Sequence, residues 1–204
     1  MKLLPAGDTA VLVELGDLEE VLSLYAQLDE DLPDGVVDMV PAAATLLLTL
    51  DPARTAVERL SRTVSTLTVG THSRAAAGEV EIPVVYDGED LADVGRLTGL
   101  GERGVVEAHT ATPWTVAFCG FAPGFGYMVG GDERLRVPRR DNPRTRVPAG
   151  AVAIAGEFAS VYPRESPGGW QLIGRTTLEV WDIGREPPAL LVPGTTVRYV
   201  EVTS

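Results

Sequence analysis

A run of guanidinium groups is the feature of this chain most able to do chemistry. Six arginines and one acid, Asp141, lie between Arg134 and Arg146, a net charge of +5 in a chain of 204 residues whose formal net charge is −12. Three prolines within residues 138–148 restrict the backbone, so the side chains lose less entropy when they bind a ligand. Guanidinium groups bind carboxylate or phosphate bidentately. The pattern indicates a clamp for an anion, with a solvated surface loop as the alternative.

A second segment, residues 166–176, reads Ser-Pro-Gly-Gly-Trp-Gln-Leu-Ile-Gly-Arg-Thr. Gly168 and Gly169 permit a positive φ or a close approach of the backbone to another group. Exposed N–H groups at this turn could form a nest that binds an anion. A simple hairpin turn feeding a strand is the alternative.

His109 is the histidine with a candidate role. It follows Val105 and Val106 on one face of an expected helix, where a histidine is either a satisfied core residue or a group that transfers a proton or contacts a ligand. Two histidines, His72 and His109, and the single cysteine, Cys119, fall short of the four or so N/S ligands of a closed zinc site. We therefore predict no metal site, and Cys119 is expected to be a buried, inert thiol in an apolar strand.

Composition excludes several classes of function. The acidic balance argues against a nucleic-acid partner, which requires a basic footprint. No apolar run reaches 18 residues, so no membrane span is expected. The short apolar start does not fit a signal peptide, and one cysteine forms no internal disulfide, so a cytoplasmic location is favoured. The only lysine is Lys2, so no phosphate-binding Gly-x-x-x-x-Gly-Lys-Ser/Thr loop is present.

The first part of the chain is predicted to be a separate domain, because residues 70–78 are small and polar like a linker. The boundaries are 1–74 and 75–204. The expected elements of the first domain are a strand over 10–15, a helix capped by Asp17 and Glu20, strands over 36–40 and 45–50, a helix opened by Asp51 and Pro52, and a last strand near 67–69. This order predicts a two-layer α/β sandwich of the ferredoxin-like type.

The second part is predicted to contain few helices and many short strands. The expected elements are a strand over 79–86, helices near 89–98 and 102–110, and strands over 114–119, 151–155, 160–162, 170–173, 178–181 and 197–202. Glycine and proline residues separate these short strands, a pattern that indicates a closed or nearly closed β-barrel. The expected fold class is therefore α+β.

Several ordered blocks resemble the allophanate hydrolase subunit 1 family, also called the 5-oxoprolinase B subunit or KipI family, which corresponds to carboxyltransferase subdomains C and D. The blocks are Gly-Phe-Ala-Pro-Gly-Phe at 120–125, Pro-Arg-Arg at 138–140, Pro-Arg-Thr-Arg-Val-Pro-Ala-Gly at 143–150, Ile-Ala-Gly at 154–156 and the segment 166–176. The resemblance implies an N-terminal α/β domain followed by a cyclophilin-like barrel. It also implies a hetero-oligomer with a partner, a homologue of allophanate hydrolase subunit 2 or of the 5-oxoprolinase C subunit.

The activity implied by the resemblance is ATP-dependent opening of the lactam 5-oxoproline to L-glutamate. ATP would be used in the complex, and the chain is expected to be inactive without its partner. The residues expected to serve this activity are Arg144 and His109 in catalytic roles, and Arg139, Arg140, Arg146, Gln171, Gly168 and Gly169 in substrate binding. Two alternatives stay open: inhibition of a sensor histidine kinase, and a carboxyltransferase component for urea or allophanate.

Overall fold

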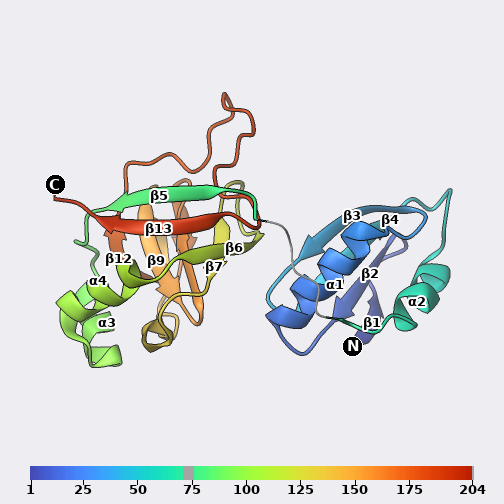
Figure 1. Ribbon diagram of the computed structural model, residues 1–204, viewed down its shortest axis with the longest axis horizontal. Coiled ribbons are helices and arrows are strands. Elements are labelled where there is room, and N and C mark those ends of the chain that lie inside the picture. The colour runs from blue at the N-terminus through green and yellow to red at the C-terminus, as the bar shows by residue number, and fades with distance from the viewer. Residues whose placement is uncertain (71–75, 204) are drawn as a thin grey trace. The chain divides into compact units, whose positions relative to one another are not determined.

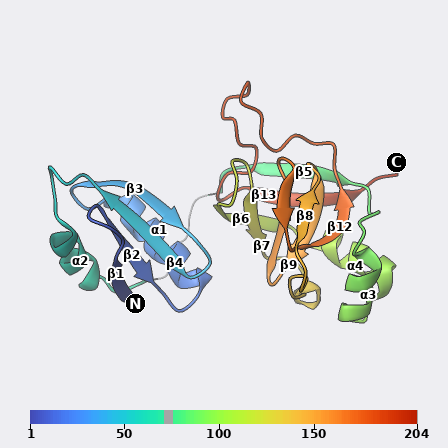
Figure 2. The same ribbon diagram turned by 180° about the vertical axis from the view of Figure 1, so that it is seen from behind.

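The computed structural model describes residues 1–70 and 76–203. The chain forms two compact units, Met1–Ala75 and Ala76–Ser204, drawn in Figures 1 and 2. The expected domain boundary between residues 74 and 75 lies outside the described residues, as does His72.

The N-terminal unit is a four-stranded antiparallel sheet with two helices. The strands lie in the order β1-β2-β4-β3. Its elements are β1 (Lys2–Pro5), β2 (Ala10–Glu14), α1 (Leu18–Glu30), β3 (Val36–Pro41), β4 (Thr45–Leu50) and α2 (Val57–Ser65). Apolar side chains of the sheet and of both helices form one core, which includes Val13, Leu24, Leu48 and Leu60. The expected mixed α/β composition is present.

Helix α1 begins where the sequence predicts. The Oδ1 atom of Asp17 accepts a hydrogen bond from the N–H of Glu20 at 2.9 Å. The carboxylate of Glu20 in turn accepts from the N–H of Gly16 at 2.8 Å. The first bond satisfies a donor that the first helical turn leaves without an intrahelical partner, and the second ties the residue before the cap to the helix.

Two predictions for this unit are wrong. The second helix does not open at Pro52, because Asp51 closes a turn in which its Oδ1 atom accepts from the N–H of Ala53 at 2.9 Å. No strand forms at 67–69. The free side of β2 is instead paired with β1, a strand that was not predicted.

The C-terminal unit is built on a seven-stranded sheet in the order β12-β9-β10-β7-β6-β13-β5. Its strands are β5 (Glu79–Val84), β6 (Trp114–Cys119), β7 (Gly126–Val129), β9 (Ala151–Ala155), β10 (Phe158–Val161), β12 (Gln171–Arg175) and β13 (Thr196–Glu201). Reciprocal backbone hydrogen bonds of 2.9 Å between Val85 and Arg175 join the end of β5 to β12. The sheet is therefore nearly closed into a barrel, as expected.

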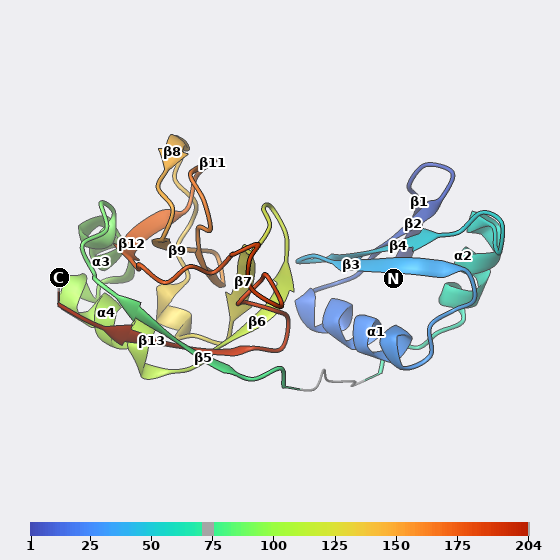
Figure 3. The same cartoon turned by 90° about the horizontal axis from the view of Figure 1, so that it is seen from above.

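Two helices and a hairpin complete this unit. Helix α3 (Leu91–Thr98) lies beside β12 and α4 (Gly101–Ala111) beside β13, as Figures 1 and 2 show. A two-stranded sheet of β8 (Arg144–Val147) and β11 (Ser166–Gly168) projects from the barrel in Figure 3. One apolar core includes Ile82, Val105 and Met128. A second, smaller core is rich in aromatic rings.

The strand predictions for this unit are mostly confirmed, with one error and three omissions. Residues 178–181 form no strand, and the segment 176–195 makes a single bridge between Trp181 and Ala189. Strands β7, β8 and β11 were not predicted, because glycine and proline within or beside them have the composition of turns. Cys119 ends β6 half-buried, with its Sγ atom 3.3 Å from the carbonyl oxygen of Leu191.

Candidate functional site

The loop of residues 138–140 carries two of the expected arginines and is fixed against the turn before β12. The backbone N–H of Arg140 donates to the carbonyl oxygen of Gly169 at 2.7 Å. The Nε2 atom of Gln171, a buried residue, donates to the carbonyl oxygen of Pro138 at 3.0 Å. The proline-arginine loop and the Gly-Gly-Trp-Gln turn, two separate candidates in the sequence, therefore meet at one place.

Asp90, a carboxylate that was not among the predicted site residues, joins this site. Its Oδ1 atom accepts from Nη2 of Arg144 at 2.8 Å and from Nη1 of Arg140, and its Oδ2 atom accepts from the N–H of Leu172 at 2.7 Å. Asp90 is 1% exposed. The available sequence signal was its place just before a helix, yet its side chain makes no capping bond to α3. We call Arg139, Arg140 and Arg144 the arginine cluster.

Asp90 is ionised at neutral pH. Burial, the strongest influence, raises the pKa of this carboxyl, but hydrogen bonds from Arg144 and from the N–H of Leu172, with the charges of Arg144 and Arg140, lower it below its usual range. The buried carboxylate therefore neutralises one of the two guanidinium charges, and the exposed Glu89 pairs with Arg144 at 3.0 Å. The Nε atom of Arg140 and the Nη1 atom of Arg144 are buried and have no hydrogen-bond partner among the described residues. A bound anion is the kind of group that satisfies such donors.

Arg139 and Arg146 differ from the anchored pair. Arg139 is exposed and has no ion-pair partner among the described residues. Burial, the largest influence, raises the pKa values of Tyr127 and Tyr162, and the charge of Arg139 opposes it in both. Arg146 instead pairs with Glu165 at 2.8 and 3.0 Å. Both of these side chains are more than half exposed, so the surface-loop alternative describes Arg146.

An aromatic cluster adjoins the arginine cluster. Its central ring, Phe125, lies 5.1 to 5.4 Å from the rings of Phe121, Tyr127, Tyr162 and Trp170, at steep interplanar angles. Phe121 is 58% exposed and has a φ of 66°, a left-handed conformation that costs free energy in a residue with a Cβ atom. Phe121 therefore presents one exposed ring at the edge of the cluster, from a strained backbone conformation.

The two glycines of the turn have different roles. A methyl group on Gly168 would overlap the hydroxyl of Tyr162, whereas one on Gly169 would meet no atom closer than 3.6 Å, in Pro143. Neither glycine has a positive φ. The close-approach interpretation is therefore confirmed for Gly168, and the positive-φ interpretation is wrong for both.

His109 is buried in the barrel core, on α4, with no exposed surface. Its Nδ1 atom lies 2.7 Å from the hydroxyl of Tyr86, and its ring centroid lies 4.1 Å from that of Tyr199 and 5.4 Å from that of Trp114. Burial lowers the pKa of His109 to about 3. The geometry favours the core interpretation of this residue over proton transfer to a ligand at the arginine cluster.

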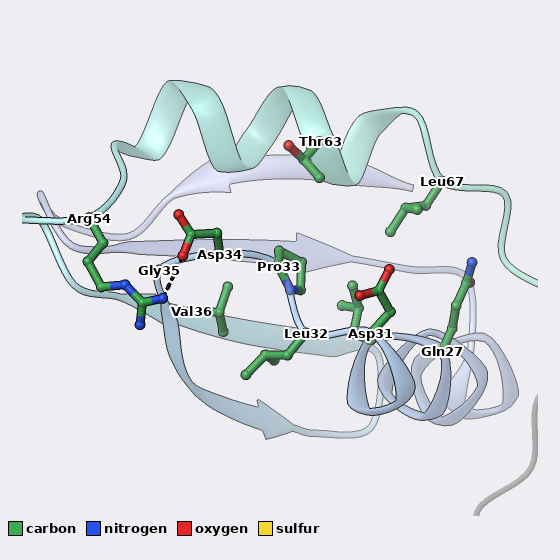
Figure 4. A pocket seen from close by; sticks show the side chains of 11 residues that line it. Gln27, Asp31, Leu32, Pro33, Asp34, Gly35, Val36, Arg54, Thr63 and Leu67 are labelled. Atoms are coloured by element: carbon green, nitrogen blue, oxygen red, sulfur yellow. Dashed lines mark hydrogen bonds and ion pairs between the residues drawn. The ribbon is translucent and has the colours of Figure 1, made fainter.

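Each unit has a surface depression large enough for a small ligand. A depression of about 460 Å³ in the C-terminal unit is lined by Arg139, Arg140, Gln171 and neighbours from α3. A larger one in the N-terminal unit, about 600 Å³, lies between the ends of α1 and α2. Figure 4 shows its polar groups apart: Arg54 pairs with Asp34 at one end, and Gln27 lies at the other. Convergence of polar groups therefore favours the first depression, which Arg139 and Arg140 line and Arg144 does not.

The described residues contain no group of three or more His, Cys, Asp or Glu side chains arranged to hold a metal ion. None of the helices in residues 1–70 and 76–203 is long and apolar enough to cross a membrane.

Comparison with known proteins places the chain in a family. A family model described as the carboxyltransferase domain, subdomain C and D, matches residues 1–191. The chain belongs to this carboxyltransferase subdomain C and D family. Among curated proteins, this family member is 42% identical to the 5-oxoprolinase B subunit of Escherichia coli O157:H7, over 95% of this chain and 93% of that protein. It is 34% identical to the 5-oxoprolinase B subunit of Haemophilus influenzae, over 98% of this chain and 97% of that protein.

Solved structures agree with the fold. TTHA0988 matches with a TM-score of 0.78 and 39% identity over 97% of this chain, which spans only 40% of the TTHA0988 chain. PH0987 from Pyrococcus horikoshii matches with a TM-score of 0.59 and 33% identity, over 100% of this chain and 98% of that one. A more distant relative, urea amidolyase of Saccharomyces cerevisiae, is 25% identical over 97% of this chain and 13% of its own length.

Proposed function

We propose that this chain is the B subunit of an ATP-dependent 5-oxoprolinase, which opens the lactam ring of 5-oxoproline to give L-glutamate. The observation that carries the proposal is the arginine cluster, in which Arg140 and Arg144 are anchored on buried Asp90, beside an aromatic cluster. A small carboxylate with a planar amide ring matches a site of guanidinium groups and ring faces. The relatives named as B subunits of 5-oxoprolinase cover nearly the whole chain and support this choice.

The arginine cluster has a defined part in this reaction. Water breaks the C–N bond of the lactam, the nitrogen leaves as the amine of glutamate, and ATP is converted to ADP and phosphate. ATP supplies, in the complex, the phosphoryl group that activates the lactam oxygen. Guanidinium groups bind carboxylate or phosphate oxygens well. We therefore place on this chain the part of the site that binds the negatively charged groups of the substrates. Arg139 contacts the ligand directly, because it is exposed and unpaired among the described residues.

The other expected residues divide by position. Arg144 and Arg140 add positive charge to the site, and their contacts with Asp90 hold both guanidinium groups in place. Gln171 holds the loop, and Gly168 lets Tyr162 approach the backbone. We assign no ligand contact to His109, which is buried, to Arg146, which pairs with Glu165, or to Gly169, whose carbonyl oxygen accepts from the N–H of Arg140.

Assembly and location extend the proposal. We infer that the chain acts in the cytoplasm and only with a partner, a homologue of the 5-oxoprolinase C subunit. The N-terminal unit is proposed to be a variant of the ferredoxin-like sandwich in which β1 takes the edge position, and the barrel to be cyclophilin-like. The distant urea amidolyase relative supports a second candidate, a carboxyltransferase component acting on urea or allophanate.

The test is reconstitution of the chain with its partner subunits. ATP hydrolysis is measured with 5-oxoproline, with urea and with neither compound, and again with this chain omitted. We expect hydrolysis that depends on 5-oxoproline and on this chain, with glutamate formed in equal amount. Stimulation by urea alone would favour the second candidate, and activity that persists without the chain would refute the proposal.

A further inference from the structure

Asp90 is tied to the barrel by its backbone as well as by its side chain. Its N–H donates to the carbonyl oxygen of Leu172 at 3.0 Å, while its Oδ2 atom accepts from the N–H of the same residue at 2.7 Å. Two positions earlier, a methyl group on Gly88 would overlap the backbone of Leu172 and Ile173. The segment 88–90 is therefore seated on β12, with little freedom to move.

The rigid carboxylate fixes the direction of the guanidinium groups that it contacts. The Oδ1 atom of Asp90 is shared by Arg144 and Arg140, and the Asp90 side chain is 2% exposed. Charge-assisted hydrogen bonds to a buried, immobile acceptor are strong and directional. Arg144 is only 15% exposed. If its guanidinium swung into solvent, buried Asp90 would keep only Arg140 and the N–H of Leu172 as partners, and the loss of a charged partner from a buried carboxylate is costly.

Glu89, the neighbour of Asp90, contacts the same guanidinium in a different setting. Its Oε2 atom lies 3.0 Å from Nη2 and 3.2 Å from Nε of Arg144. The Glu89 side chain is 77% exposed, so solvent screens this pair. The chain thus offers two adjacent carboxylates on one arginine, of which only Asp90 is anchored.

We propose that Asp90 is the positioning residue of the anion site: it acts through Arg144, holding that guanidinium in the orientation that meets the negative charge of the substrate. This inference rests on the proposed function for the identity of the substrate. The geometric part of the inference is independent of the proposed function, because any phosphate or carboxylate would meet the same guanidinium group.

The experiment is a double-variant cycle in the reconstituted complex. Asp90→Asn is expected to lower kcat/KM for 5-oxoproline by at least about tenfold, the cost of a misdirected contact. The matched control, Glu89→Gln, is expected to change it by less than about threefold, as for a screened surface pair. On an Arg144→Gln background, only the contact of Asp90 with Arg140 remains to be lost. Asp90→Asn is therefore expected to add less than about threefold, because residues that act through one another are not additive. An independent loss of tenfold on that background would overturn the proposal.

Two further arms keep the outcome decisive. If Asp90→Asn alone does not fold, the double variant, which leaves no buried carboxylate unpaired, is compared directly with Arg144→Gln, and a kcat/KM within about threefold is expected. Binding of inorganic phosphate to the chain alone is measured by calorimetry, with weakening of at least about tenfold expected in Asp90→Asn. If the complex proves inactive on 5-oxoproline, the proposed function fails, whereas phosphate binding unaffected by Asp90→Asn would refute the positioning role.

Discussion

Acidification should destabilise the barrel through His109, and the size of the effect follows from its burial. The folded state holds the pKa of His109 at about 3, against about 6.5 in an unfolded chain. Below pH 6.5 the unfolded state binds a proton that the folded state does not bind. The contribution of neutral His109 to the free energy of unfolding is therefore fully present above that pH. It is lost as pH falls from about 6.5 towards 3. By linkage, unfolding becomes easier by about 2 kcal/mol between pH 7 and pH 5.

The assay compares urea unfolding of the wild-type chain and of His109→Gln at pH 7 and pH 5. All three tryptophans, Trp114, Trp170 and Trp181, lie in the C-terminal unit, so tryptophan fluorescence follows that unit alone. Other acids titrate equally in both proteins, so the difference between their pH dependences isolates the histidine. Glutamine keeps a polar group beside the hydroxyl of Tyr86 and has no charge to gain.

Equal pH dependence of the wild type and of His109→Gln would refute this reasoning. It would mean that the imidazole is protonated in the folded state, or reaches solvent, near neutral pH. The same result would revive proton transfer as a role for His109, because a group with a pKa near 7 suits that task. The measurement therefore tests stability and the assignment of function together.

Two further variants test the arrangement of the site. Gly168→Ala should lower the free energy of unfolding by about 1–3 kcal/mol, because its methyl group overlaps the Tyr162 hydroxyl, and it should also lower turnover; an unchanged urea midpoint would contradict the close approach. Arg139→Gln should reduce kcat/KM of the complex by at least about tenfold. The matched Arg146→Gln, which breaks only the exposed pair with Glu165, should change it by less than about twofold; equal losses would contradict the division of roles.

Much of the fold could be predicted from the sequence, because local capping and apolar patterns agree with the helix ends and the buried positions of the structure. The cap at Asp17 and the apolar strand over 114–119 follow directly from their sequences, and both form as expected. The errors lie where one local sequence pattern is compatible with two different structures. Asp51 and Pro52 have the composition of a helix start, but the same residues close a turn. Strand β8 lies in a segment that reads as a stiff loop, and only its pairing with β11, about twenty residues away, makes it a strand.

The candidate site was predicted in part for a similar reason. Residue type identified the arginines and the Gly-Gly-Trp-Gln turn, since few other side chains recognise anions in a fork geometry. Asp90 was missed because its partners are distant in sequence: Arg144 is 54 positions away and Leu172 is 82. Before a helix, an aspartate normally indicates a cap, and nothing local distinguishes it from exposed Glu89. Only the barrel brings the carboxylate and the guanidinium groups together.

The dependence of the site on the barrel has a physical consequence for the stability of the C-terminal unit. Asp90 is seated on Leu172 in β12, and β12 is also the strand that closes the barrel through Arg175 and Val85. Any loosening of that closure moves the anchor of Arg144 without touching the arginine itself. Because an unpaired buried carboxylate is costly, anchor and closure stabilise one another. A ligand that holds Arg144 in place therefore also favours the closed barrel, so substrate binding and stability of this unit should rise together.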